Sequence, residues 1–298
     1  MTRKFMSAAL LAFCVLTLNA QTDTLRQAIK QFTQTKKADI GVSIYGLEDK
    51  DSVGTHQEKH FPMQSVFKFH IALAILHGVD NGKFQLAQKI WVSKKDLVPD
   101  TWSPLRDAHL NGDLYLTLED ILAYTVSQSD NIGCDILLRL IGGPKKVDQY
   151  LHQIGIKDVA IKASEAEMHK NWNVQFTNWT TPTAANELLL MFYQRNILSK
   201  TMKPFLWKLM TETTTGKNKI KGQLPENTLV AHKTGSSGAN KDGLTAASND
   251  IGIVTLPNGK HFAISVFVSN SMEDEDTNAA IIATISKLAW DYYVAKIN

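Results

Sequence analysis

The amino-acid sequence predicts an α/β fold of the α+β type, an antiparallel sheet flanked by helices plus an all-helical region. Strand-like alternation occurs near residue 40 and again between about residues 229 and 269, whereas the middle of the 298-residue chain has helical periodicity. No repeat or Pro/Gly-rich linker separates these parts. We therefore expect one domain over 21–298, with a sheet subdomain at about 21–58 and 212–298 and a helical subdomain at about 59–211.

The first elements follow from periodicity and turn signals. Residues 22–35 are amphipathic, Ile40–Leu47 alternates as a strand, and the Asp49–Gly54 cluster indicates a turn. From Ser65 to about Val79 the apolar residues cover most of the helix surface. A helix that is apolar all round is buried, so we expect this one at the centre of the molecule.

The middle of the chain is predicted to be mainly helical, with helices near 118–124, 132–141, 147–154, 183–193 and 203–211. Residues 157–181 show no clear period. A structureless stretch of that length inside a compact domain is usually functional.

Strands resume in the last third. Leu229–His232 is predicted as a strand, and Ile251–Leu256 with Phe262–Ser269 as a hairpin. A helix over Thr277–Ile297 closes the chain. Both ends of the chain therefore contribute strands to one sheet, with the helical region packed beside it.

The N-terminal segment resembles an export signal in its charge and apolar pattern. Arg3 and Lys4 precede the short apolar run Met6–Leu18, and Ala20 ends a small-residue cleavage site. The run is too short to span a membrane, and no later stretch reaches roughly 18 apolar residues. We expect residues 1–20 to be removed and the mature protein to be soluble, periplasmic and monomeric.

Charge and metal-ligand patterns exclude several classes of function. The formal net charge is +3, and two of those charges lie in the predicted signal. Such a balance favours neither nucleic acid nor a membrane surface as a partner. Cys134 is the one cysteine of the predicted mature chain, so no internal disulfide can form. The nine histidines are scattered, with His56 and His60 the only i,i+4 pair, so no metal site is predicted.

The motif Ser65-Val66-Phe67-Lys68 begins the most apolar helix. Spacing i, i+3 puts the Ser65 hydroxyl and the Lys68 amine on one face within hydrogen-bonding reach. The helix N-terminus favours a developing oxyanion, and an amine in a dry pocket can lose its proton and accept one from the hydroxyl. A single S-x-x-K also arises by chance, so the interpretation depends on its companions.

Two further motifs supply those companions. Ser129-Asp130-Asn131 precedes a helix, where Asp130 is suited to cap the N-terminus. On a functional interpretation, Ser129 passes a proton to a leaving nitrogen and Asn131 binds a substrate amide.

Lys233-Thr234-Gly235 follows a strand and precedes Ser236. An edge strand can bind an extended substrate, and glycine allows close approach. Lys233 and Thr234 would bind a carboxylate, and the N–H groups of Ser236 and Ser65 would form an oxyanion hole. A simple polar turn is the alternative.

In this order the three motifs are the signature of serine enzymes that open β-lactam rings or transfer D-alanyl peptides. Over essentially the whole mature chain, the sequence resembles a class A serine β-lactamase. The resemblance implies the fold shared with penicillin-binding transpeptidases, with Ser65 at the junction of a sheet domain and a helical domain. It also implies an acyl-enzyme route to a small-molecule β-lactam, with no metal or organic cofactor.

The family's deacylating base is a Glu on a loop after the S-D-N helix, usually followed four residues later by Asn. Glu167 with Asn171 fits that spacing literally, whereas Glu165 with His169 lies at the expected distance from S-D-N. We favour Glu165 and leave Glu167 open. A solvated loop carboxylate is the ordinary state of either residue.

The same loop departs from the family pattern. An Arg before the base and an Asp near the loop's end often clamp it, but Ala163 and Asn178 stand at those places, so we expect no clamp. Gln64, His169 and this loop resemble the extended-spectrum branch typified by PER and VEB enzymes. By that resemblance a rearranged loop would admit oxyimino-cephalosporins.

Two further positions match the family by local context. Trp102-Ser103-Pro104 resembles the aromatic-Ser-Pro segment that forms one wall of the cleft, although a Trp in the core or on the surface is an alternative. Lys219 and Lys221 fall where the family often has arginines near the carboxylate pocket. Lys is a less specific carboxylate partner than Arg.

The motifs leave other functions open. A D-alanyl-D-alanine carboxypeptidase or other penicillin-binding protein would use the same residues without efficient deacylation, and a β-lactam receptor would not turn over at all. The Glu-bearing loop and the single compact domain favour the hydrolase. Whether Lys68 or Glu165, acting through water, takes the first proton is not decided by sequence.

Overall fold

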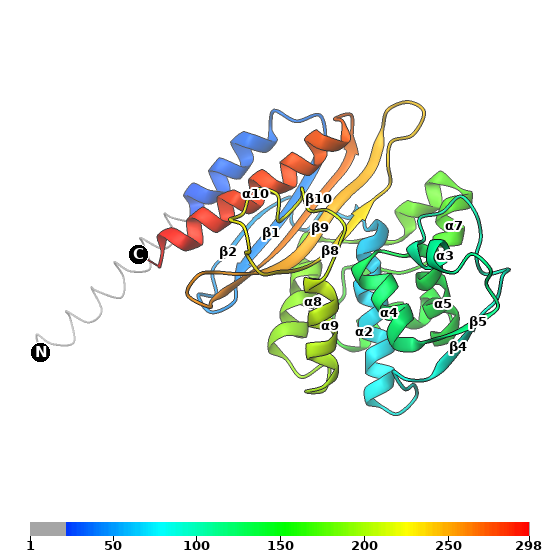
Figure 1. The fold of residues 1–298 in the computed structure, drawn as a ribbon. Helices are drawn as coiled ribbons and strands as arrows, with labels where there is room; N and C mark the ends of the chain where they lie inside the picture. The colour runs from blue at the N-terminus through cyan, green and yellow to red at the C-terminus, as the bar shows by residue number, and fades with distance from the viewer. Residues whose placement is uncertain (1–21, 298) are drawn as a thin grey trace, which may run out of the picture.

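The computed structural model describes residues 22–297 (Figure 1), so the predicted export signal at 1–20 lies outside the described residues. Its centre is a five-stranded sheet in the order β2-β1-β10-β9-β8, with every neighbouring pair antiparallel. The strands are β1 (Asp39–Gly46), β2 (Ser52–Thr55), β8 (Val230–Ser236), β9 (Thr245–Thr255) and β10 (His261–Ser271). Both ends of the chain contribute to the sheet, as predicted.

Helices cover both faces of this sheet (Figure 1). A helix over residues 22–33 and α10 (Glu275–Ala295) lie on one face. On the other face, α8 (Pro182–Gln194) packs against β1 and β10, and α9 (Met202–Thr211) packs against β8. The alternation of strand side chains explains the two layers: in β10, Phe262, Ile264, Val266 and Val268 belong to the core under α10, whereas Ala263 and Phe267 belong to the core on the helical side.

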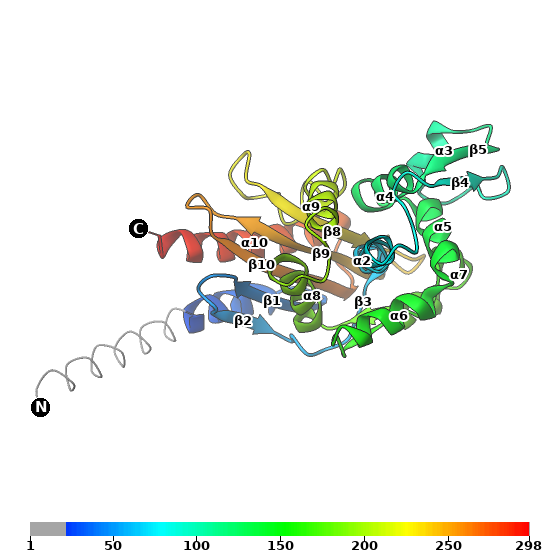
Figure 2. The same ribbon diagram turned by 90° about the horizontal axis from the view of Figure 1, so that it is seen from below.

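The predicted central helix is confirmed. A 3-10 turn at Gln64–Val66 leads into α2 (Phe67–Asp80), most of whose residues are buried. Figure 2 looks nearly along α2 and shows other helices around it. Those in contact with it are α4 (Leu118–Ser127), α5 (Asn131–Ile141), α6 (Pro144–Gln153) and α9. Because α2 is surrounded, its sequence has no polar face.

The expectation that 157–181 lacks regular structure is wrong. This segment contains β6 (Val159–Ala160), α7 (Glu165–Lys170), a 3-10 helix at Trp172–Thr177 and β7 (Trp179–Thr180). β7 pairs with β6 and with β3 (Phe61–Pro62). Each helix is six residues long and each strand two, so none is long enough to produce a detectable period.

Three short elements near the helical region were not predicted. β4 (Lys89–Val92) and β5 (Leu114–Thr117) form a separate hairpin-like pair, and α3 (Pro104–Ala108) is a five-residue helix. The predicted turn at 49–54 is also too long, because β2 already begins at Ser52. Among the described residues, none of the helices is long and apolar enough to cross a membrane.

Candidate active site

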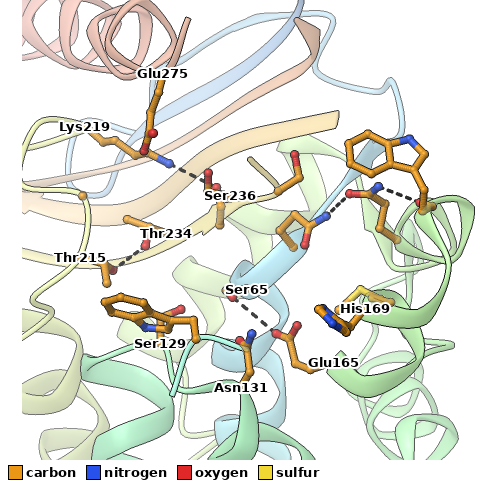
Figure 3. A pocket seen from close by; sticks show the side chains of 18 of the residues that line it. Ser65, Ser129, Asn131, Glu165, His169, Thr215, Lys219, Thr234, Ser236 and Glu275 are labelled. Carbon is orange, nitrogen blue, oxygen red and sulfur yellow. Dashed lines mark hydrogen bonds between the residues drawn. The ribbon is translucent and has the colours of Figure 1, made fainter. Parts of the chain in front are cut away.

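The three motifs meet at a cavity of about 630 Å³ between the helices and the edge strand β8 (Figure 3). All the predicted catalytic and substrate-binding residues line this cavity except the two lysines of the motifs, Lys68 and Lys233. The predicted residues that line it are Ser65, Trp102, Ser129, Asn131, Glu165, His169, Thr234, Gly235 and Ser236. Lys68 and Lys233 are fully buried beneath this lining. Residues from distant parts of the chain therefore share one cavity.

Lys68 lies at the centre of the polar cluster. Its Nζ is surrounded by four oxygen atoms, namely Ser65 Oγ at 2.7 Å, Asn131 Oδ1 at 2.6 Å, Ser129 O at 3.0 Å and Glu165 Oε1 at 2.7 Å. An ammonium group has only three protons to donate. Transfer of one of them to Glu165 would leave an amine lone pair available to the Ser65 hydroxyl.

The backbone around Ser65 approaches β8 closely. A Cβ added to Gly235 would lie 2.4 Å from Met63 O and 3.2 Å from Ser65 N, so only glycine fits there. Ser237 N donates to Ala247 O across the sheet. Because N–H directions alternate along a strand, the Ser236 N–H points away from β9, off the sheet edge. Ser236 follows directly after Gly235, the residue that lies against the Ser65 backbone.

The residue before the nucleophile has an unusual backbone. Gln64 has φ +47°, a left-handed conformation that is uncommon outside glycine. Its side-chain amide donates to Gln175 Oε1, and Gln175 Nε2 donates to Trp172 O at 2.7 Å. These bonds connect the turn that carries Ser65 to the segment that follows α7, and so hold the two walls of the cavity together.

Lys233 points toward the second motif. Its Nζ donates to Ser129 Oγ at 2.8 Å and to Thr234 O at 3.0 Å. Burial, reinforced by the nearby charge of Lys68, holds the pKa of Lys233 well below its usual range. Beside it, the hydroxyls of Thr234 and Thr215 share a hydrogen bond of 2.6 Å. This end of the cavity thus combines hydroxyl groups with a buried amine behind them.

Asp130 of the second motif is a structural cap, as predicted. It is fully buried and its carboxylate accepts from Gly133 N at 2.7 Å, Ser103 Oγ at 2.8 Å and Leu105 N at 2.7 Å. It therefore fixes the start of α5 against α3.

Trp102 stands beside that cap. It is 60% exposed at the cavity wall, and its Nε1 donates to Gln128 O at 2.9 Å. An indole anchored at one end leaves its face free for a ligand.

The geometry separates the two candidate carboxylates. Glu165 Oε1 lies 2.7 Å from Lys68 Nζ and 3.5 Å from Ser65 Oγ. Glu167 instead accepts from the backbone N–H of Ser164 at 2.8 Å and from its hydroxyl at 2.9 Å, in a capping box. These hydrogen bonds lower the pKa of Glu167. Glu165, not Glu167, therefore lies beside Ser65.

The Arg–Asp clamp of the family is absent here, as expected from Ala163 and Asn178, but Asn178 holds the loop in another way. Asn178 is fully buried, and its Oδ1 accepts from Lys162 N at 2.7 Å and Ala163 N at 2.9 Å while its Nδ2 donates to Ala163 O at 2.9 Å. A neutral amide can bind both kinds of backbone group, so it clamps the loop without an arginine.

A second support of the loop was missed by sequence analysis. Asp135, on α5, accepts from Glu165 N at 2.8 Å and Ala166 N at 2.9 Å at the start of α7. Burial raises the pKa of Asp135 to about 6. The sequence feature that could have identified Asp135 is its spacing from Asn131. It lies four residues after Asn131 and therefore on the same face of α5.

Of the two lysines proposed near the carboxylate pocket, Lys219 lines the cavity and Lys221 is not among its lining residues. Lys219 Nζ donates to the carbonyls of Gly235 and Asn249, both at 3.3 Å. Burial lowers its pKa to about 8. Glu275, which sequence analysis did not identify, lines the same end of the cavity. Within residues 22–297, no three His, Cys, Asp or Glu side chains are grouped so that they could hold a metal ion.

Comparison of the sequence with known proteins identifies the same kind of enzyme as the geometry of the site. The Beta-lactamase enzyme family model matches residues 24–293. The chain is 51% identical to Beta-lactamase VEB-1 of Pseudomonas aeruginosa, over 96% of each chain. It is 41% identical to Extended-spectrum beta-lactamase PER-1 of the same organism, over 97% of this chain and 94% of that one.

Solved structures give the same result. The TLA-3 extended-spectrum beta-lactamase aligns with a TM-score of 0.90 and 53% identity, over 92% of this chain and 99% of that one. A class A beta-lactamase from Bacteroides cellulosilyticus aligns with a TM-score of 0.89 and 40% identity over the same shares. Three motifs in one cavity, a matching family model and close relatives of full length together place this chain in the β-lactamase enzyme family, among the class A serine enzymes.

Proposed function

We propose that this enzyme hydrolyses the β-lactam amide bond of penicillins and cephalosporins through an acyl-enzyme on Ser65, and thereby confers antibiotic resistance. One observation supports this most: Lys68 Nζ lies 2.7 Å from Ser65 Oγ and 2.7 Å from Glu165 Oε1. A nucleophile, an amine and a carboxylate in mutual contact can move a proton both into and out of the reaction.

In acylation, Ser65 Oγ attacks the lactam carbonyl carbon and gives up its proton. The acceptor is Lys68, or Glu165 through an intervening water, and both lie within reach of the hydroxyl. The carbonyl oxygen becomes an oxyanion, which the N–H groups of Ser65 and Ser236 stabilise. The C–N bond then breaks, and the ring nitrogen takes the proton of Ser129, whose hydroxyl is 2.8 Å from Lys233 Nζ. Ser129 is reprotonated by the group that took the proton of Ser65, so no net charge is left on it.

In deacylation, Glu165 removes a proton from a water molecule that attacks the ester carbonyl, and the ester bond to Ser65 breaks. The ring-opened acid leaves, and Ser65 regains its proton. The position of Glu165, 3.5 Å from Ser65 Oγ, supports this role. Asn131 has two roles in this proposal. It orients Lys68 through their 2.6 Å hydrogen bond, and it binds the amide of the substrate's side chain.

The remaining lining residues suit the rest of a β-lactam. Thr234, with the Lys233 amine buried beneath it, binds its carboxylate, Lys219 lies nearby, and Gly235 lets the substrate lie along β8. Trp102 and His169 line the same cavity as Ser65 and contribute to its wall. A cavity of about 630 Å³, and the extended-spectrum names of PER-1 and TLA-3, support oxyimino-cephalosporins among the substrates.

Turnover of a chromogenic cephalosporin tests the proposal. We expect steady hydrolysis over many equivalents, and no hydrolysis by Ser65→Ala. A burst of one equivalent followed by a stall would instead indicate a penicillin-binding carboxypeptidase or a β-lactam receptor. Intact-protein mass spectrometry would then show a lasting adduct on the unmodified enzyme.

We also propose that the enzyme acts as a periplasmic monomer comprising residues 21–298. The export-type pattern at the N-terminus supports secretion. The larger hydrophobic core runs from the helices into the sheet through Ala231, Ile253 and Phe267, which supports a single domain made of the two predicted subdomains. N-terminal sequencing of the periplasmic fraction, with gel filtration of the product, tests all three points.

A further inference from the structure

Glu275 is the first residue of α10, and its side chain reaches the cavity that contains Ser65 (Figure 3). Among the residues the structure describes, its carboxylate forms no hydrogen bond and no ion pair. A free carboxylate on the wall of a substrate cavity is available to a ligand.

The two preceding acidic residues differ in this respect. Glu273 Oε1 accepts from the Lys37 backbone N–H at 2.8 Å, and Asp274 caps α10 by accepting from Thr277 N at 2.7 Å. Both carboxylates hold the start of α10 in place and neither lines the cavity with Ser65. Glu275 thus differs from Glu273 and Asp274 because its carboxylate is unpaired and lines the cavity with Ser65.

Lys219 lines the same cavity as Glu275, and the Glu275 carboxylate acts on it electrostatically. The two side chains face each other in Figure 3 without forming an ion pair. Burial lowers the pKa of Lys219 to about 8, while the carboxylates of Asp250 and Glu275 oppose that shift. At neutral pH this end of the cavity therefore presents a positive charge followed by a negative one.

That order of charges matches one group of cephalosporins. In a cephalosporin the carboxylate is on ring carbon C4, and the variable substituent is on the adjacent carbon C3. A carboxylate bound at Lys233 and Thr234, with Lys219 nearby, would place the C3 substituent on the side of Glu275. Complementary charges across a binding site favour the matching ligand and disfavour the opposite one.

We propose that Glu275 is a specificity-determining residue, which makes the site prefer cephalosporins whose C3 substituent is cationic. This inference rests on the proposed function, which places the substrate carboxylate at Lys233 and Thr234, with Lys219 nearby. The preferred substrate is a zwitterion whose two charges mirror those of Lys219 and Glu275.

A purely structural role for Glu275 is the competing explanation. A carboxylate in the first turn of a helix stabilises it through the helix dipole. Asp276, like Glu275, lies in the first turn of α10 and so interacts with the same helix dipole, but it does not line the cavity. Asp276→Asn is therefore a matched control for Glu275→Gln: each removes one negative charge from the same turn.

Three cephalosporins with the same methoxyimino-aminothiazolyl acyl group provide the test. Their C3 substituents are cationic in cefepime, neutral in cefotaxime and anionic in ceftriaxone. For Glu275→Gln we expect kcat/KM to fall about three- to fivefold for the cationic substrate and to rise by a similar factor for the anionic one. The cationic-to-anionic ratio then changes about tenfold, and high salt weakens the effect in the unmodified enzyme.

The control variant Asp276→Asn should leave that ratio within about twofold of the unmodified enzyme. An equal shift for all three substrates in Glu275→Gln, or a shift of the ratio in Asp276→Asn as large as that in Glu275→Gln, would overturn the inference. Failure of the proposed function gives a different result: the unmodified enzyme would then turn over none of the three substrates.

Discussion

The side-chain amide of Asn178 binds both backbone polar groups of Ala163: it accepts from the Ala163 N–H and donates to the Ala163 carbonyl, each at 2.9 Å. Ala163 lies two residues before Glu165, so this pair fixes the chain that leads into α7. The paired bonds need no charge, because an amide is donor and acceptor at once. Loop geometry here depends on a neutral contact in a fully buried place.

Replacing that amide should therefore affect both stability and turnover. Asn178→Ala leaves the Ala163 backbone groups and Lys162 N without their partner, and we expect a loss of roughly 3 kcal/mol in the free energy of unfolding. Displacement of Glu165 should slow deacylation by about 10- to 100-fold. Urea unfolding and pre-steady-state kinetics measure the two effects. Asn173→Ala, in the same segment but exposed, should change neither.

The catalytic motifs were predictable because their geometry is local. Ser65 and Lys68 are three residues apart on one helix, so sequence spacing alone places them in contact. The position of Glu165 depends instead on how α7 lies against α5, which no local pattern encodes. Sequence favoured it only by resemblance, and the hydrogen bonds of Asp135 to the start of α7 explain the outcome.

The errors have a similar cause. The clamp was sought as an ion pair, whereas Asn178 acts through the backbone, and a lone Asn gives no such signal in a sequence. The hairpin of β9 and β10 was predicted correctly, because both strands are long and apolar and a Pro-Asn-Gly turn separates them. Short elements such as β4 and α7 depend on tertiary contacts and on a single capping box, so periodicity cannot detect them.

The two acidic residues of α7 should differ sharply in their effect on turnover. Glu165→Gln removes the proposed base, and we expect deacylation to slow by about 10²- to 10⁴-fold while acylation continues. Mass spectrometry should then show the acyl-enzyme accumulating. Glu167→Gln only weakens the capping box, so it should turn over normally with a stability loss of about 1 kcal/mol. The reverse pattern would assign the base to Glu167.

The affinity for substrate should depend on pH through Lys219. Its pKa of about 8 means that it loses its charge as pH rises through that value, so kcat/KM should fall on the alkaline side. Loss of a charged carboxylate partner corresponds to about tenfold or more. Lys219→Arg should remove this alkaline limb, because a guanidinium stays protonated. The control variant Lys221→Arg changes a residue outside the cavity lining and should retain the alkaline limb. If the alkaline limb persists in Lys219→Arg, the titrating group is Lys233 instead.

Stability should depend on a second polar cluster, far from the three motifs, around Asp51. This carboxylate is 8% exposed and accepts from three groups, Tyr292 OH at 2.5 Å, Tyr293 OH at 3.1 Å and Lys296 Nζ at 2.9 Å. It therefore ties the last turn of α10 to the start of β2.

Asp51→Ala should lower the free energy of unfolding by about 3 kcal/mol, because it leaves buried hydroxyls and the Lys296 ammonium without their acceptor. Asp49→Ala is the matched control. Asp49 forms more exposed ion pairs with Lys260 and Lys296, so its removal should lower the free energy of unfolding by less than about 1 kcal/mol. Thermal and urea unfolding measure both. Neither residue lines the cavity with Ser65, so kcat/KM below the unfolding temperature should follow the unmodified enzyme, and a loss of activity without a loss of stability would contradict this assignment.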